Sequence, residues 1–148
     1  MIKFKKTDPQ YKCFSNFYLT KIRYDGLVFT SSEAAWQAQK SLDKNIRKTF
    51  QQKTPSNAKY EGRRIKLRPD WEKIKYQLMV DVCYAKFSQN PQIKEILLST
   101  KDEELIEDTT GWHDNLWGNC DCPKCKNIAG KNLLGKALME VRNKLNKI

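Results

Sequence analysis

One short segment of this sequence gathers proton-transfer groups and flat apolar walls, the two ingredients that hydrolysis of a glycosidic bond requires. In such a reaction a carboxylate stabilises an oxocarbenium-like centre or activates water, and an apolar wall excludes bulk solvent. The segment LIEDTTGWHDNLWGN supplies both within eleven residues: Glu107, Asp108, Trp112, His113, Asp114 and Trp117. The alternative is a capped loop whose tryptophans anchor the core, with His113 as an ordinary exposed residue.

A second candidate is the pair Glu33 and Lys40, which are seven positions apart. In a helix seven positions make two turns, so both side chains leave the same side about 10 Å apart. Trp36 and Gln37 lie between them, and the stretch EAAWQAQ is unusually free of charge for a solvated surface. On spacing alone, a solvated helix face with Glu33 engaged in a capping box is nevertheless the more common arrangement.

The segment GRRIKLRPDW concentrates cations directly before an indole. It holds Gly62, Arg63, Arg64, Lys66, Arg68 and Trp71. Guanidinium forks match the geometry of phosphate, and an indole stacks on a base. The segment therefore predicts a phosphate and ring clamp, although a charged surface loop before a core tryptophan has the same pattern.

Three of the five cysteines, Cys120, Cys122 and Cys125, fall within six residues. Cys122 to Cys125 is a knuckle spacing that suits two thiolates on one zinc ion, and Cys120 can add a third. The fourth ligand would have to come from Cys13, Cys83 or His113. Plain reduced thiols are the alternative, because the tight spacing does not suggest a secreted disulfide framework.

Several elements must position these groups, beginning with a β-hairpin. Short β-prone runs at 22–24 and 27–29 flank Asp25-Gly26, the pair that a type I′ turn prefers. Thr30 to Glu33 reads as a capping box that opens a helix of about twenty residues, with Ala35, Gln39, Leu42, Ile46 and Phe50 along one face. Thr54-Pro55 predicts a second, short helix that stops near Gly62.

The second half of the chain continues with helices and one irregular segment. Helical periodicity runs from Trp71 to Ala85, Pro91 opens a short helix, and Leu105-Ile106 reads as a strand. Periodicity disappears from 108 to 131 and returns in a stripe of Leu134, Leu138, Val141 and Leu145. We therefore expect one helix-rich α+β domain over residues 1–148 with a small β-hairpin or sheet.

Length, charge and hydropathy narrow the class of protein. The chain has 148 residues, the size of one domain, and a formal charge of +11 that attracts phosphates or, equally, serves solubility. The first residues are too polar for a signal peptide, and no apolar run approaches the roughly 18 residues of a membrane helix. We expect a cytoplasmic or nuclear protein that does not contact a membrane.

Taken together, these blocks resemble the YbiA-like or NADAR family. The matching segments are FSNFY at 14–18, FTSSEAAWQAQK at 29–40, YEGRRIKLRPDW at 60–71, AKF at 85–87, LLST and LIEDT within 97–109, LWGN at 116–119 and GKNLLGKALMEVR at 130–142. Their order and spacing span nearly the whole chain. The resemblance departs between Trp117 and Gly130, where a glycine-rich stretch is common in bacterial members and the cysteine cluster stands here.

The resemblance implies an N-glycosidase that needs no cofactor. One branch resembles enzymes that cleave ribosylaminopyrimidine phosphate intermediates of riboflavin biosynthesis, and another resembles enzymes that remove ADP-ribose from guanine in nucleic acid. It implies a catalytic role for Glu33, Lys40 and Glu107, with Lys40 attacking C1 of the sugar to form a Schiff base. The implied substrate-binding residues are Phe17, Trp36, Gly62, Arg63, Arg64, Arg68, Trp71, Trp117, Gly118 and Asn132.

Three functions remain open on the sequence. The first is this hydrolase, with either a ribosyl-phosphate or an ADP-ribosyl substrate; the basic charge slightly favours nucleic acid as the carrier of the modification. The second is a catalytically silent module that binds ADP-ribose or nucleic acid. The third, a zinc-knuckle nucleic-acid protein, rests only on Cys120, Cys122 and Cys125, with a structural zinc as the one metal the sequence suggests.

Overall fold

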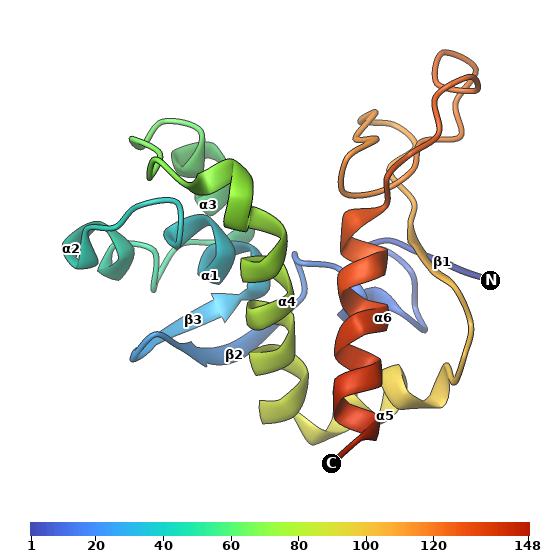
Figure 1. Cartoon of the computed structure of the whole chain (residues 1–148), viewed down its shortest axis with the longest axis horizontal. Coiled ribbons are helices and arrows are strands. Elements are labelled where there is room, and N and C mark those ends of the chain that lie inside the picture. The colour runs from blue at the N-terminus through green and yellow to red at the C-terminus, as the bar shows by residue number, and fades with distance from the viewer. The chain divides into compact units, whose positions relative to one another are not determined.

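The computed structural model describes residues 1–148 and divides them into two compact units. Unit 1 comprises Met1–Ser15 and Gln92–Ile148, and unit 2 comprises Asn16–Pro91. Helices predominate over two small two-stranded sheets, which confirms the expected α+β class (Figure 1). No helix is both long enough and apolar enough to pass through a membrane.

The sheet of unit 2 is the hairpin that the sequence predicts. Strand β2 (Leu19–Tyr24) pairs antiparallel with β3 (Leu27–Ser31), and Tyr24 faces Leu27 across the turn. Asp25 and Gly26 have φ of 54° and 73°, and positive φ at both turn residues is what a type I′ turn requires. Alternation then buries Ile22 and Phe29 on one face.

The helix predicted after the hairpin is broken into two. Helix α1 runs from Ser32 to Ala38 and α2 from Lys44 to Lys48. The break follows from local side-chain bonds, since the Ser41 hydroxyl accepts from Asp43 N–H and the Asp43 carboxylate caps α2. The predicted continuous apolar stripe is therefore wrong at Leu42, whose side chain is 62% exposed.

Two further helices of unit 2 begin and end where the sequence indicates. Helix α3 (Pro55–Gly62) starts with Thr54 accepting from Asn57 N–H, and α4 (Trp71–Gln89) follows the 63–70 loop. Both helices pack against α1, and α4 also packs on β2, as Figure 1 shows in green beside the blue hairpin. Helix α1 is consequently enclosed, and each of its residues is buried.

Unit 1 contains a strand that the sequence analysis missed. Strand β1 (Ile2–Phe4) pairs parallel with β4 (Leu105–Glu107), and only the second was predicted. Three residues give too short a pattern to identify a strand without its partner. A 3-10 turn η1 (Lys12–Phe14) follows β1, and α5 (Pro91–Ser99) begins at the predicted proline.

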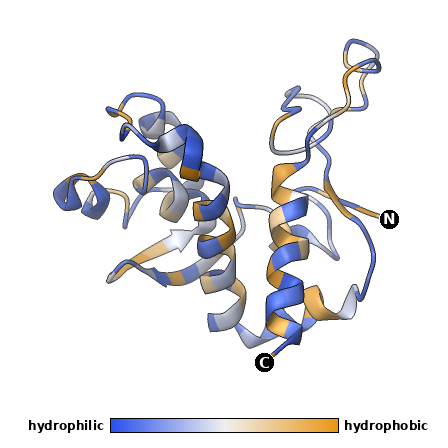
Figure 2. Ribbon diagram, viewed as in Figure 1, coloured by the Kyte–Doolittle hydropathy of each residue, from blue (hydrophilic) through white to orange (hydrophobic).

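Helix α6 (Leu133–Asn146) closes unit 1 and packs on β4. Figure 2 shows it banded in apolar and polar residues, and all four residues of the predicted stripe are buried. The segment 108–131 before it holds no helix or strand, as expected, apart from a single bridge between Asp108 and Asn119.

Candidate active site

The Glu33 carboxylate is held inside unit 2 at the first turn of α1. Helix α1 is capped by Ser31, whose hydroxyl accepts from Ala34 N–H at 3.1 Å; Thr30, the expected cap, lies in β3 instead. Glu33 is 8% exposed and Oε2 accepts a 2.7 Å bond from Gln37 Nε2. The interpretation of this face as solvated is therefore wrong, because β3, α3 and α4 cover it.

Gln37 carries a buried acceptor that no group in the chain satisfies. Its Nε2 donates to Glu33, and its Oε1 has no hydrogen-bond partner although it is buried. Gly62 lies directly against this amide, so that a Cβ at position 62 would overlap Oε1. An orphaned buried acceptor costs about 1–3 kcal/mol, a cost that a hydroxyl or N–H of a bound molecule would remove.

Lys40 lies at the far end of the same strip. Its Nζ is 5.5 Å from the ring centre of Trp36 and 5.7 Å from that of Trp71, and it donates to the Gly62 carbonyl at 3.3 Å. Burial lowers the pKa of Lys40 below that of an ordinary lysine; Glu33 opposes this shift and Arg63 adds to it. A larger fraction of Lys40 is thus a neutral, nucleophilic amine at a given pH.

Two indoles form the apolar wall of this strip. Trp36 and Trp71 have ring centres 5.0 Å apart at an interplanar angle of 53°, and both are buried. Trp36 Nε1 donates to the Lys75 carbonyl at 3.0 Å, which satisfies its only polar atom and fixes the ring. Phe17, half-buried, has the Lys59 ammonium 5.9 Å from its ring centre.

The arginines of the 63–70 loop have different surroundings. Arg68 bonds Asp70 through both Nε and a terminal nitrogen, at 2.7 and 3.3 Å, and holds the pKa of that carboxyl below its usual value. Its N–H and guanidinium also donate to the backbone carbonyls of 40 and 39, so it ties the loop to the end of α1. Arg63 and Arg64 are both exposed, and Arg64 also donates to the Tyr60 hydroxyl at 3.1 Å.

The remaining predicted site residues belong to unit 1 and surround the end of β4. Asn132 accepts from Glu107 N–H at 3.0 Å and donates to the Leu105 carbonyl at 2.8 Å. Gly118 lies so close to the Glu107 carbonyl that a Cβ there would be 2.6 Å from its oxygen. Trp117 is half-buried, and its carbonyl accepts from Leu134 N–H. The roles predicted for these four residues, Glu107, Trp117, Gly118 and Asn132, remain predictions.

The sequence as a whole matches one protein family and its relatives. The NADAR domain profile matches residues 3–146. The chain belongs to the NADAR domain family. The N-glycosidase YbiA of Escherichia coli is 38% identical over 148 residues, with 98% of this chain and 88% of that protein covered. The riboflavin biosynthesis protein VVA0006 of Vibrio vulnificus is 32% identical, with 97% of this chain and 38% of that protein covered.

A solved structure supports the same assignment. The NMR structure of E. coli YbiA superimposes with a TM-score of 0.83 at 37% identity and covers 99% of this NADAR chain and 84% of its own. The resemblance and the fold class inferred from the sequence are thereby confirmed.

Lys86 of this NADAR domain is a buried cation that is not among the site residues predicted from the sequence. Its side chain is 0% exposed, its Nζ donates to the Ser32 hydroxyl at 3.3 Å, and the rings of Tyr18 and Phe87 lie within 6 Å. Ser32 in turn donates to Asn16 at 2.8 Å, directly beside Glu33 in the chain. The signal was present, because Lys86 falls four residues after Val82 on the apolar face of α4.

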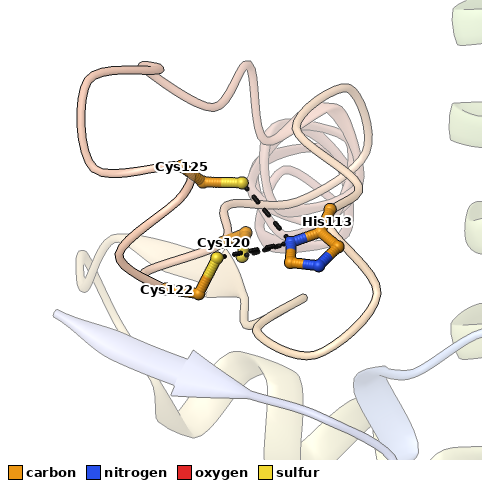
Figure 3. Close-up of side chains that lie close together, drawn as sticks. All are labelled: His113, Cys120, Cys122 and Cys125. Carbon is orange, nitrogen blue, oxygen red and sulfur yellow. Dashed lines mark hydrogen bonds between the residues drawn. The ribbon is translucent and has the colours of Figure 1, made fainter.

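A cluster of metal-ligating side chains forms in the 108–131 loop of unit 1. The ligand atoms of His113, Cys120, Cys122 and Cys125 lie within 4.8 Å of one another, an arrangement suited to a metal ion (Figure 3). Of the three candidates for a fourth ligand, the structure selects His113; Cys13 and Cys83 are buried elsewhere. A backbone hydrogen bond from Cys122 is the main cause that lowers the pKa of Cys120 to about 6.

Proposed function

We propose that this NADAR protein is an N-glycosidase that hydrolyses the bond between C1 of a ribosyl group and a nitrogen of its base. One observation carries the proposal: α1 and the turn after it hold a buried carboxylate, Glu33, and an amine of lowered pKa, Lys40, beside one aromatic wall. Relatives that share about 38% of the sequence are named N-glycosidases, which supports the same activity here.

Glu33 supplies the acid and base functions of the proposed reaction. Its position in the first turn of α1 stabilises the carboxylate, because the helix N-terminus carries partial positive charge. The bond from Gln37 fixes the carboxylate, which takes up the proton that Lys40 Nζ loses, passes it to the departing base and later takes a proton from water. Gln37 Oε1 accepts a hydrogen bond from a hydroxyl of the sugar, and this bond satisfies the buried acceptor.

Lys40 acts as the nucleophile. Its Nζ attacks C1 as the bond from C1 to the base nitrogen breaks, and the bonding electrons leave with the base, which takes up a proton. Loss of a proton from Nζ and opening of the ribose ring give a Schiff base. Water then adds to C1, the bond from C1 to Nζ breaks, and the amine and the free sugar are released. Trp36 and Trp71 exclude competing water during these steps.

The other predicted residues bind the substrate. Arg63 and Arg64 present guanidinium groups to its phosphates, while Arg68 positions their loop through Asp70. In unit 1, Glu107 is the second candidate for the catalytic carboxylate. Further substrate contacts in this proposal are Phe17, Gly62, Trp117, Gly118 and Asn132. The chemistry uses water and side chains, without a cofactor.

Two substrates fit the proposed chemistry, and charge favours one of them. ADP-ribose on guanine in nucleic acid and a ribosylaminopyrimidine phosphate share the ribosyl N-glycosidic bond. A formal charge of +11 suits a polyanionic carrier better than a small intermediate.

We further propose that both units act as one domain, since the family match spans both. We also propose that the protein works in the cytoplasm or the nucleus, because its five cysteines form no disulfide.

The test measures base release from both substrates by wild type and Glu33→Gln. Wild type releases guanine-containing nucleic acid free of ADP-ribose, or the free aminopyrimidine, and Glu33→Gln lowers turnover by on the order of 10²–10⁴-fold because it removes the proton-transfer group. The matched control is Glu72→Gln in the same unit, since the Glu72 side chain is 79% exposed and pairs only with Lys75.

The possible results separate the candidate functions. Full turnover in Glu33→Gln together with a loss in Glu107→Gln would transfer the catalytic role to Glu107. Failure of wild type on both substrates, with ADP-ribose or nucleic acid still bound, would favour the catalytically silent binding module.

A further inference from the structure

One nitrogen atom of unit 1 lies within hydrogen-bond distance of three sulfur atoms. His113 Nδ1 is 3.5 Å from the sulfur of Cys120, 3.3 Å from that of Cys122 and 3.5 Å from that of Cys125 (Figure 3). An imidazole nitrogen either carries one proton or offers one lone pair, so it can make one such bond. Three simultaneous contacts therefore exceed what hydrogen bonding explains.

A metal ion at the centre of these four atoms accounts for the distances. With Zn–S near 2.3 Å and Zn–N near 2.0–2.1 Å, tetrahedral geometry separates the nitrogen from each sulfur by about 3.5–3.6 Å and the sulfurs from one another by about 3.8 Å. The three contacts at His113 agree with the first value within a few tenths of an ångström, and all ligand atoms lie within 4.8 Å of one another.

We propose that His113 Nδ1 and the thiolates of Cys120, Cys122 and Cys125 bind one zinc ion in unit 1. Three soft sulfurs and one imidazole in a tetrahedral arrangement select zinc over harder cations that prefer oxygen ligands. Four protein ligands leave no position open for water or substrate, so the site is structural.

The backbone around the ligands is arranged to present them. Cys125 N–H donates to the Cys122 carbonyl at 3.0 Å, which closes the turn between these two ligands, and Cys120 N–H donates to the Asn115 side chain at 3.0 Å. His113 adopts the left-handed conformation, with φ of 59°. A non-glycine residue pays a conformational cost there, and ligation of the ring gives a reason for the chain to accept it.

The zinc ion supplies what the outer part of the loop lacks. Two of its large apolar side chains, Trp112 and Ile128, are 45% and 51% exposed, so they add little to a core. The base of the loop is tied by backbone bonds between Thr109 and Asn119 and between Asn119 and Glu107. Zinc joins the His113 arm to the cysteine arm and so orders the part beyond those bonds. Lys124 and Lys126 flank Cys125 in the sequence, and their charge is opposite to the net charge of three thiolates with one Zn²⁺.

The experiment measures metal content and geometry in the whole chain. Protein produced in zinc-supplemented medium and purified under reducing conditions should contain about one zinc ion per chain, as measured by elemental mass spectrometry. Exchange with Co²⁺ gives sulfur-to-cobalt charge-transfer bands and the intense d–d bands of tetrahedral coordination. The double variant Cys120→Ala/Cys125→Ala loses the zinc, and His113→Ala weakens binding by at least about tenfold in competition with a chromophoric chelator.

Cys83→Ala is the matched control, because Cys83 is a buried cysteine of the other unit, and it keeps one zinc per chain. A measurement on the wild type alone covers the case in which the double variant does not fold. In the wild type, zinc protects Cys120, Cys122 and Cys125 from alkylation, and removal of zinc by a chelator makes all three thiols reactive. The proposal is overturned if the wild type binds neither zinc nor cobalt, or if the double variant retains its zinc. It is also overturned if the purified wild type contains iron and sulfide instead of zinc.

Discussion

Helix α1 of unit 2 and the 108–131 loop of unit 1 each place tryptophan near a carboxylate, yet they hold these side chains by different means. In α1 every side chain is buried by neighbouring helices and strands, so packing fixes Glu33 and Trp36. In the loop, side-chain acceptors replace regular hydrogen bonding. Asp114 accepts from the N–H groups of 116 and 117, and Asn119 accepts from Gly130 N–H.

The two regions should therefore respond to different kinds of substitution. Packed groups respond to changes of volume, because a close-packed interior has no room to absorb an added methyl group. Groups held by single polar contacts respond instead to the loss of those contacts. Substitutions at three positions, Gly62, Asn132 and Arg63, test whether the contrast holds.

The largest effect is expected from Gly62→Ala. The added methyl group displaces the Gln37 amide, which then releases the Glu33 carboxylate from its fixed position. A misplacement of this kind costs on the order of 10²-fold in turnover. Steady-state kinetics of base release measure it, and circular dichroism verifies that α1 and α3 still form.

A double variant separates this mechanism from a general disturbance of α3. In a Gln37→Ala background the obstructing amide is absent, so Gly62→Ala should cost little further activity. An equal loss in both backgrounds would mean that Gly62 does not act through Gln37.

An intermediate effect, on stability, is expected at Asn132 in unit 1. Asn132→Gly removes the bonds to Glu107 and Leu105 and should lower the free energy of unfolding by about 1–3 kcal/mol. Asn132 has φ of 52°, so Asn132→Ala should cost about 1 kcal/mol more, because alanine resists the left-handed conformation. Urea unfolding measures both variants. Equal unfolding free energies would contradict the conformational part, and a loss of turnover in folded Asn132→Gly would support the predicted substrate contact.

The smallest effect is a shift of the pH profile in Arg63→Gln. The Arg63 charge contributes to the lowered pKa of Lys40, so its removal raises that pKa. Because the neutral amine attacks, the limb of log kcat that rises with pH should move to higher pH. Arg64→Gln is the control, since Arg64 contacts Tyr60 and should leave the limb in place. An unmoved limb in Arg63→Gln would argue against Lys40 as the titrating nucleophile.

Local signals predicted most of the regular elements. Asp25-Gly26 identified the hairpin and Thr54-Pro55 identified α3 from its cap to Gly62, because turn and cap residues act on their immediate neighbours. The same kind of signal failed at Thr30 and Leu42. Ser31 caps α1 in place of Thr30, and the helical period continues in the sequence across a break at which Ser41 accepts from Asp43 N–H and Asp43 caps α2.

The candidate site depended more on distant contacts. The sequence placed Glu33, Trp36 and Lys40 on one strip and, through the family resemblance, connected them with Gly62 and Trp71. It did not reveal that the Gln37 acceptor is buried against Gly62, or that Lys86 lies beside Ser32, because these contacts join residues 25 or more positions apart.

The sequence by itself therefore determined the family, the hairpin turn, the cap of α3 and the set of residue types available for chemistry, since these depend on neighbours along the chain. Only the tertiary structure decided that α1 is buried on every side and which residue completes the cysteine cluster. Burial and ligand geometry depend on segments that folding brings together. Residue spacing allowed either a solvated or a buried Glu33, and packing around α1 buries it. Spacing also left three candidates for the fourth ligand, and the left-handed turn at His113 places that residue beside the three cysteines.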